Sequence, residues 1–175
     1  MAGPQRPFNQ VAIAFDADGK LIVTQNNIEV KSNRGAVLGL YEYSSPSQTN
    51  NGSLYIWQPK GRSMAYPTFS EDGKLMIFTS DMSGGEGSAD LYYCELKDGS
   101  WTRPVNMGSV INTPGVETSP YIHSSGKIFF SSNGRSDSRK LDLYYCFRTE
   151  DGFTEPVRYD GILNSTADDY GVFIS

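Results

Sequence analysis

The pentapeptide Asp-Leu-Tyr-Tyr-Cys occurs twice in the chain, as Asp90–Cys94 and as Asp142–Cys146. The two copies lie 52 residues apart, since 142 − 90 = 52. Residues on the C-terminal side recur at the same spacing: Trp101 and Phe153, Pro104 and Pro156, Asn112 and Asn164. Self-similarity at a fixed period of about 50 residues indicates a repeat architecture, so the pentapeptide marks a repeated unit.

A hairpin sequence precedes each copy of the pentapeptide. "YPTFSEDGKLMIFTS" spans residues 66–80, "SPYIHSSGKIFFSS" spans 119–132, and a fainter copy, "AIAFDADGKLIVTQ", spans 12–25. Gly73 and Gly126 are expected to take a positive φ in the turns of the second and third copies. Strand-forming runs in the second unit predict four short strands near residues 65–70, 74–80, 89–95 and 101–106.

Repeated units of four antiparallel strands predict an all-β fold, a β-propeller whose blades pack face to face. We expect one propeller region over residues 1–175, with a divergent blade at 11–60, blades at 64–113 and 117–165, and the first strand of a fourth blade at 168–175. About three blades fall short of the four to eight that close a propeller. The count predicts a fragment of a longer protein or completion by another chain, with self-association through open blade edges as one form.

Composition narrows the classes of partner. The chain has 18 Gly, 9 Pro and 11 Tyr, which favours short strands and tight turns. Lys and Arg total 15 against 20 Asp and Glu, a net charge of −5 without the basic stripe that nucleic acids require. No apolar run approaches the roughly 20 residues of a membrane span, and the first residues lack the apolar stretch of a signal peptide.

The unit from Tyr66 to Thr113 resembles the WD40-like repeats of TolB-type propellers. The resemblance rests on the Pro-x-Phe-Ser-x-Asp-Gly-Lys hairpin, the Gly-rich loop before Asp90 and the Trp101-x-x-Pro-Val-Asn segment. It is closest to propellers of OmpA-family envelope proteins of Bacteroidota, including PorE-like proteins of the type IX secretion and gliding machinery. This resemblance implies a periplasmic or outer-membrane-associated location with protein partners, although Ser125 replaces the usual Asp of the hairpin.

The sequence carries no recognisable motif for catalysis, metal binding or disulfide formation. Cys94 and Cys146 fall at equivalent positions of neighbouring blades, about 10 Å apart, which predicts free, buried thiols and no disulfide. With one His, His123, which aligns with a turn residue, the chain predicts no metal site and no cofactor. No Gly-x-Ser-x-Gly nucleophile elbow occurs, and no catalytic residue is predicted.

Recurring side chains outside the hairpins are predicted to be structural. Asp90 and Asp142 precede Leu-Tyr-Tyr in register, where a short carboxylate can accept backbone N–H groups from the preceding loop. Trp101 and Phe153 are expected to fill the space between blades.

Candidate functional residues come from positions that do not repeat. The loops near residues 81–89 and 133–140 carry opposite charges, from Asp81 and Glu86 in one and from Arg135, Arg139 and Lys140 in the other. Equivalent loops of opposite sign suggest a patterned protein-binding surface. Glu117, Asp168 and Asp169 precede innermost strands, so a closed propeller could place these carboxylates at one channel mouth.

The leading hypothesis is a non-catalytic propeller module for protein–protein interaction or scaffolding in a bacterial cell-envelope complex. The alternatives are the propeller part of an enzyme, such as a serine peptidase or a glycoside-active protein, and a carbohydrate-binding propeller.

Overall fold

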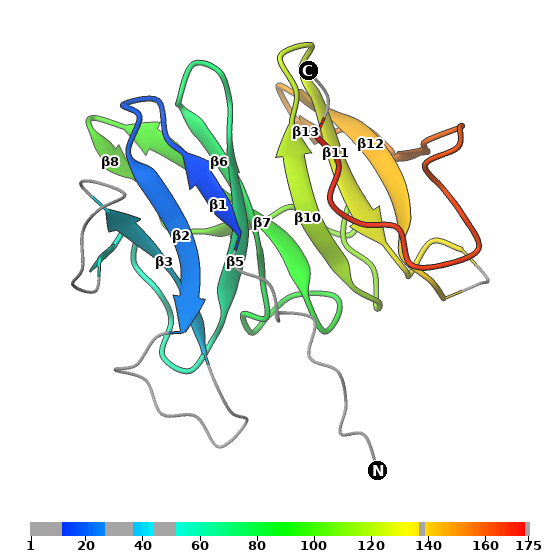
Figure 1. Cartoon of the computed structure of the whole chain (residues 1–175), viewed down its shortest axis with the longest axis horizontal. Coiled ribbons are helices and arrows are strands. Elements are labelled where there is room, and N and C mark those ends of the chain that lie inside the picture. Colours follow the sequence, from blue (N-terminus) through cyan, green and yellow to red (C-terminus); the bar gives the residue numbers. More distant parts are fainter. Residues whose placement is uncertain (1–11, 27–36, 44–51, 137–138, 174–175) are drawn as a thin grey trace.

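The computed structural model describes residues 12–26, 37–43, 52–136 and 139–173. These residues form fourteen strands and no helix, arranged as three antiparallel sheets side by side (Figure 1). The prediction of an all-β fold with antiparallel blades is confirmed. Among these residues, no helix long and apolar enough to cross a membrane occurs.

The first sheet, blade one, has the strand order β1-β2-β3-β4. Asp16 shapes its hairpin turn, because its carboxylate accepts the backbone N–H groups of Asp18 and Lys20 at 3.0 and 2.9 Å. The strands of blade one are β1 (Ile13–Phe15), β2 (Leu21–Asn26), β3 (Leu38–Tyr43) and β4 (Ser53–Leu54).

Blade two has the order β5-β6-β7-β8, and a further strand, β9, also pairs with β7. Gly73 takes a φ of 66° in the hairpin turn, where a residue with a side chain would be strained. The strands are β5 (Met64–Phe69), β6 (Leu75–Ser80), β7 (Asp90–Lys97), β8 (Ser100–Trp101) and β9 (Val105–Asn106).

Blade three repeats this arrangement, with Gly126 at a φ of 83° in its hairpin turn. The strands are β10 (Glu117–Ile122), β11 (Lys127–Ser132), β12 (Asp142–Thr149), β13 (Gly152–Phe153) and β14 (Val157–Arg158). Residues 168–173, expected to start a fourth blade, form no strand in the structure.

The outermost strand of blades two and three differs from the sequence expectation. A single strand near 101–106 was predicted, whereas the structure has two segments, Ser100–Trp101 and Val105–Asn106, which both pair with β7. Pro104 and its equivalent Pro156 lie between the segments. Because proline has no N–H to donate, the ladder is interrupted there in both blades.

Two hydrophobic clusters hold the blades together. Between blades one and two, Ile22 and Leu40 pack against residues that include Met76, Phe78 and Cys94. Between blades two and three, a larger cluster buries these side chains: Leu75, Ile77, Leu91, Met107, Ile111, Ile128, Phe130, Tyr144 and Cys146. Blade two is therefore buried on both faces, which explains its nearly continuous apolar strands.

Blade three has one uncovered face. Ile111 of blade two is 0% exposed because blade three covers it, whereas its repeat equivalent, Leu163, is 42% exposed. The neighbouring Ile162 is 98% exposed. Leu163 is thus an apolar residue at a position that is buried in blade two, whereas Val110, the equivalent of Ile162, is already 39% exposed there.

In each of blades two and three, one asparagine ties the outer segment to the rest of the blade. The Asn112 carboxamide accepts the Leu91 N–H at 2.8 Å and donates to the Leu91 carbonyl at 3.0 Å. Asn164 holds Leu143 in the same way, at 2.6 and 3.1 Å. The recurrence of Asn at 52 residues therefore reflects a repeated two-way clamp on the Leu of the pentapeptide.

Candidate functional site

The innermost strands of the three blades enclose a groove of about 640 Å³. Strands β1, β5 and β10 lie next to one another in the middle of the molecule (Figure 1). Four segments line the groove: residues 12–15, 66–69, 119–122 and 170–173. The segment at 170–173 thus completes the wall in the place that a fourth innermost strand would take.

The groove depends on a bulge in two of these strands. The register shifts between Ala65 and Thr68 in β5 and between Thr118 and Tyr121 in β10. Tyr66 and its repeat equivalent, Ser119, have φ angles of 55° and 52°, in the left-handed region. A non-glycine residue there costs about 1–2 kcal/mol, so the surrounding structure has to hold the bulge in place.

Gly171 takes the position equivalent to Tyr66 and Ser119, and glycine adopts a positive φ without strain. Asp169 forms the same hydrogen bonds to Ser165 that Glu117 forms to Thr113, which places Gly171 two residues on in the position of Ser119. Gly171 has a φ of 73°. The same backbone turn therefore recurs in three wall segments.

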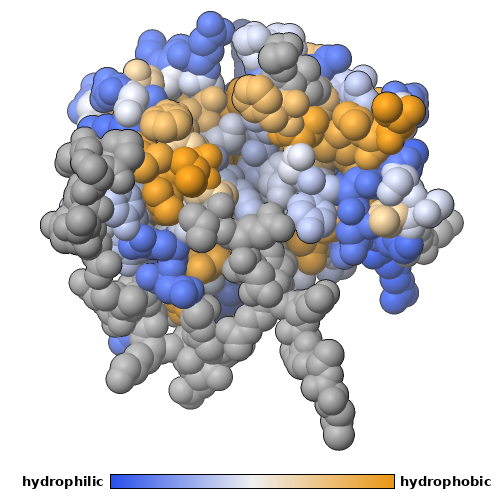
Figure 2. All heavy atoms as spheres, in the orientation of Figure 1, coloured by the Kyte–Doolittle hydropathy of each residue, from blue (hydrophilic) through white to orange (hydrophobic). Residues whose placement is uncertain are grey.

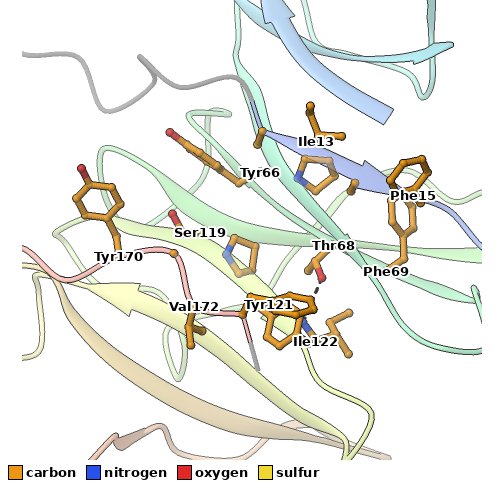
Figure 3. A pocket seen from close by; sticks show the side chains of 16 residues that line it. Ile13, Phe15, Tyr66, Thr68, Phe69, Ser119, Tyr121, Ile122, Tyr170 and Val172 are labelled. Atoms are coloured by element: carbon orange, nitrogen blue, oxygen red, sulfur yellow. Dashed lines mark hydrogen bonds between the residues drawn. The ribbon is translucent and has the colours of Figure 1, made fainter. Parts of the chain in front are cut away.

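Hydrogen bonds between blades fix the wall. The Thr24 hydroxyl accepts the Tyr66 N–H at 3.2 Å, and the Thr68 hydroxyl accepts the Ile122 N–H at 3.1 Å. The second of these bonds is drawn in Figure 3. Each bond joins one blade to the next, so the innermost strands are held at a defined separation.

Aromatic and aliphatic side chains dominate the groove. In Figure 3, Phe15 and Phe69 lie together, on the far side of the groove from Tyr66 and Tyr170. Burial, followed by the nearby Tyr170 hydroxyl, raises the pKa of Tyr66, so its phenol stays neutral across the physiological range. Figure 2 shows hydrophobic residues in orange gathered around this hollow.

Charged side chains are absent from the sixteen residues that line the groove. Its polar groups are the Tyr66, Tyr121 and Tyr170 phenols and the hydroxyls of Thr68 and Ser119, together with backbone groups. Exposed Ile13 and Phe15 lie at its rim, 62% and 61% exposed. The groove can therefore accept an apolar or aromatic group and hydrogen-bond to neutral polar atoms.

The structure places Glu117 inside the fold, which corrects its expected place at a channel mouth. Glu117 is 0% exposed, and its carboxyl group accepts the Thr113 N–H at 2.8 Å and the Thr113 and Ser132 hydroxyls at 2.6 Å each. Burial raises the pKa of Glu117 despite these donors. The side chain ties the loop before β10 to β11.

Asp168 and Asp169 are also engaged within the fold and do not line the groove. The Asp168 carboxylate accepts the Leu141 N–H at 2.9 Å. Asp169 accepts the Ser165 hydroxyl at 2.9 Å and the Ser165 N–H. For Asp168 and Asp169, a place at the channel mouth of a closed propeller therefore stays a prediction, whereas the burial of Glu117 speaks against it for that residue.

The two charged loops are partly used by the fold as well. The Asp81 carboxylate accepts the Ser63 N–H at 2.6 Å, and the Arg135 guanidinium donates to the Val110 and Ile111 carbonyls. Lys140 donates to the Thr166 carbonyl. Glu86 and Arg139 are exposed. Asp81 and Arg135 thus have structural contacts that the sequence pattern did not reveal.

The recurring aspartates have different partners. Buried Asp90 accepts the Gly87 N–H at 3.1 Å from the Gly-rich loop, and burial raises its pKa. Asp142, also buried, instead pairs with Arg158 at 3.0 Å. The loop before Asp142 corresponds to the Gly-rich loop before Asp90. It includes residues 137–138, which lie outside the described residues.

The remaining recurring residues lie at the blade junctions. Trp101 packs at the junction of blades one and two, with its ring 6.2 Å from that of Tyr55. Phe153 packs at the next junction, 5.6 Å from Tyr93. Cys94 and Cys146 are free and buried, and burial raises the pKa of each thiol to about 12. Within the described residues, no group of three or more His, Cys, Asp or Glu is placed to hold a metal ion.

Sequence reasoning missed the groove. Its signal is the Pro67 and Pro120 pair in the two hairpin copies, each directly after the residue with positive φ. A proline in an otherwise good strand marks a bulge or an edge, and here it marks the bulge that shapes the wall.

No protein-family model and no curated protein matches the chain. Among solved structures, TolB from Acinetobacter baumannii matches with a TM-score of 0.52 and 19% identity, over 86% of this chain and 32% of that chain. A thermostable family-43 glycoside hydrolase matches with a TM-score of 0.52 and 16% identity, over 89% of this chain and 55% of that chain. A fucose lectin from Kordia zhangzhouensis matches with a TM-score of 0.41 and 12% identity, over 89% and 100%.

The chain therefore spans 32% and 55% of the two structures that it matches with a TM-score of 0.52. At such low identity these matches speak for the fold alone. Together with the three antiparallel sheets, they show a partial β-propeller similar to those of TolB and of the family-43 glycoside hydrolase.

Proposed function

We propose that this chain is a non-catalytic propeller module that binds protein partners through the groove between its innermost strands. The observation that carries the proposal is an uncharged, aromatic-lined groove of about 640 Å³ with exposed apolar residues at its rim. Apolar grooves with a few polar groups are typical binding sites, and aromatic side chains commonly dominate the energy of an interface.

The chemistry of the groove favours binding over hydrolysis. Glycoside hydrolysis in its usual form needs two carboxyl groups on either side of the scissile bond, and acyl transfer needs a nucleophile next to a base. The sixteen lining residues include no Asp, Glu, His or Cys. Enzyme activity of a larger protein containing this chain stays the alternative proposal.

An apolar or aromatic segment of a protein is the partner we propose for the groove. The walls provide phenols and threonine and serine hydroxyls, which match backbone amide groups of an inserted segment. Because no lining residue is charged, a charged side chain entering the groove would lose its hydration without a partner.

Two substitutions taken from the repeat test this proposal with little risk to folding. Tyr66→Ser installs the residue found at the equivalent Ser119, which has almost the same φ. Tyr121→Thr installs the residue found at the equivalent Thr68. Peptides selected from a phage-displayed library on the wild-type chain should be rich in apolar and aromatic residues. They should bind the double variant at least roughly tenfold more weakly, as loss of aromatic anchors commonly causes.

Ile162→Ser is the matched control, since Ile162 is 98% exposed and does not line the groove. It should leave the affinity for the selected peptides unchanged. Selected peptides that bind the double variant as tightly as the wild type would contradict the proposal.

The cell envelope is the location we propose, with the resemblance to TolB-type repeats of OmpA-family and PorE-like envelope proteins as its basis. Fractionation of cells of the source organism, with antibodies against this chain, tests the location. Recovery in the cytoplasmic fraction would contradict it.

Self-association through open blade edges is a further part of the proposal. Its support is the uncovered face of blade three, where Leu163 is 42% exposed while its equivalent in blade two is fully buried. Sedimentation velocity of the wild type and of Leu163→Ser should show a larger assembly only for the wild type. Two monomeric samples would remove this part of the proposal.

A further inference from the structure

A second pocket, of about 700 Å³, lies between blades one and two at their hairpin ends. It is separate from the groove, with which it shares no lining residue. Its walls include Tyr55, Trp57 and Trp101, and charged side chains surround the rings.

This pocket exists where the repeat is broken. Leu40-Tyr41 correspond to Leu91-Tyr92, so Glu42 stands where Tyr93 stands in blade two and Tyr145 in blade three. At the junction of blades two and three, the Tyr93 ring packs 5.6 Å from Phe153, and the Arg148 guanidinium lies 5.5 Å from the Tyr93 ring.

At the junction of blades one and two, Glu42 provides no ring to fill this space. Phe153 corresponds to Trp101, which therefore lines an open pocket. The pocket is thus a local departure from a packing arrangement that the chain uses elsewhere.

The aromatic wall is held by ring contacts and a hydrogen bond, and it is partly exposed. The Tyr55 ring lies 6.0 Å from Phe69 and 6.2 Å from Trp101, and Tyr55 donates its hydroxyl hydrogen to Asp16 at 2.9 Å. Trp57 is 52% exposed, with the Arg103 guanidinium 4.4 Å from its ring centroid. An exposed indole held by such a contact presents a flat apolar surface to a ligand.

The charges around the pocket nearly cancel. Four acidic and three basic side chains line the pocket, which leaves 4 − 3 = 1 net negative charge. The acidic residues are Asp16, Asp18, Glu42 and Asp72, and the basic residues are Lys20, Lys74 and Arg103. Lys20 and Glu42 pair with each other at 3.4 Å. Neither a strongly cationic nor a strongly anionic ligand is matched by this balance, whereas both donors and acceptors of hydrogen bonds are plentiful.

We infer that this pocket binds a neutral saccharide. A sugar ring has an apolar face of C–H groups, which suits Trp57, and a rim of hydroxyls that both donate and accept, which suits mixed carboxylates and cations. The volume lies within the range of about 300–1,000 Å³ of small-molecule sites. This function is independent of the protein-binding groove.

The chain contains two tryptophans, and both line the pocket, so its intrinsic fluorescence reports ligand binding directly. The purified chain is first screened on an array of neutral and acidic glycans. The best neutral trisaccharide is then titrated while tryptophan emission is recorded. We expect a saturable change in emission.

Three variants locate the site. Trp57→Ala removes the exposed ring and should weaken binding by at least roughly tenfold. Glu42→Tyr restores the residue of the other two blades, which should fill the pocket against Trp101 and abolish binding while the fold is retained. Tyr66→Ser, in the groove, is the control and should bind the saccharide as the wild type does.

Circular dichroism spectra and urea midpoints of the variants establish that each is folded. The inference is overturned if no neutral glycan binds, if an acidic or basic compound binds in its place, or if folded Trp57→Ala and Glu42→Tyr bind as the wild type does. Failure of the peptide test on the double variant in the groove leaves this test intact, because the two sites share no residue.

Discussion

Replacing Asn112 with Ala should destabilise the protein far more than the same change at its repeat equivalent, Asn164. Asn112 is 2% exposed and forms three hydrogen bonds: two to the Leu91 backbone and one to the Asn106 side chain at 2.9 Å. Without the carboxamide, the Leu91 N–H loses this acceptor in a fully buried place. The Leu91 carbonyl keeps a second donor, the Met107 N–H at 3.0 Å.

The magnitude follows from these contacts. A buried backbone N–H left unsatisfied costs about 1–3 kcal/mol, and each of the other two hydrogen bonds contributes about 0.5–1.5 kcal/mol. We expect Asn112→Ala to lower the free energy of unfolding by about 3 kcal/mol. Asn164 makes equivalent bonds to Leu143, but it lies half-buried beside exposed Leu163, where water can replace the lost partners. Asn164→Ala should therefore cost about 1 kcal/mol.

Urea denaturation followed by far-ultraviolet circular dichroism measures both values. With a typical dependence of about 1–3 kcal/mol per molar urea, Asn112→Ala should lower the midpoint by about 1–3 M, and Asn164→Ala by less than half of that. Equal shifts for the two variants, or a larger shift for Asn164→Ala, would refute the reasoning that burial by the next blade sets the cost.

Three further predictions concern single residues. Burial raises the pKa of Glu117, so a proton on this carboxyl group stabilises the folded state. This stabilisation is complete below the unfolded-state pKa of about 4.3 and is lost as pH rises through the higher folded-state pKa. Glu117→Gln, which does not titrate, should gain stability relative to the wild type as pH rises from about 4 through the raised folded-state pKa of Glu117; urea midpoints that keep a constant difference over this rise would contradict this. Gly73→Ala should cost about 1 kcal/mol more than Gly126→Ala in thermal unfolding, because a Cβ at Gly73 would meet Ala17 Cβ at 2.2 Å whereas one at Gly126 meets nothing within 4 Å. Cys94 and Cys146, buried with pKa values near 12, should not react with a thiol-specific disulfide reagent at about pH 8 until urea unfolds the chain; rapid reaction of the native protein would argue against their burial.

The strand pattern of the fold could be predicted because it repeats. The pentapeptide at Asp90 and Asp142 starts β7 and β12, and both strands bury Leu, Tyr and Cys in the same order. A positive φ was predicted for Gly73 and Gly126 because they lie in hairpin turns, and both residues have a positive φ. Features that the backbone requires recur at 52 residues, so two copies of one sequence reveal them.

The candidate site could not be predicted in the same way. Tyr66, Ser119 and Gly171 share one backbone conformation but differ in side chain, so comparison of the repeats finds no common residue. Glu117 looked available because it precedes a strand, but the register that pairs it with Ser132 brings its carboxyl group into the fold. Strand register and bulges depend on contacts between strands, which the spacing of residues along the chain does not encode.

The positions at which the blades disagree are therefore the informative ones for function. Positions whose residue type is set by packing alone carry similar apolar residues in neighbouring blades. Examples are Ile77 with its equivalent Phe129, and Leu91 with its equivalent Leu143. Glu42 departs from Tyr93 and Tyr145 although the surrounding ladder is unchanged, and the departure exposes aromatic surface that a tyrosine would cover. Aromatic surface that lines an open pocket at this junction and is packed at the junction of blades two and three is the observation on which the proposed saccharide site rests.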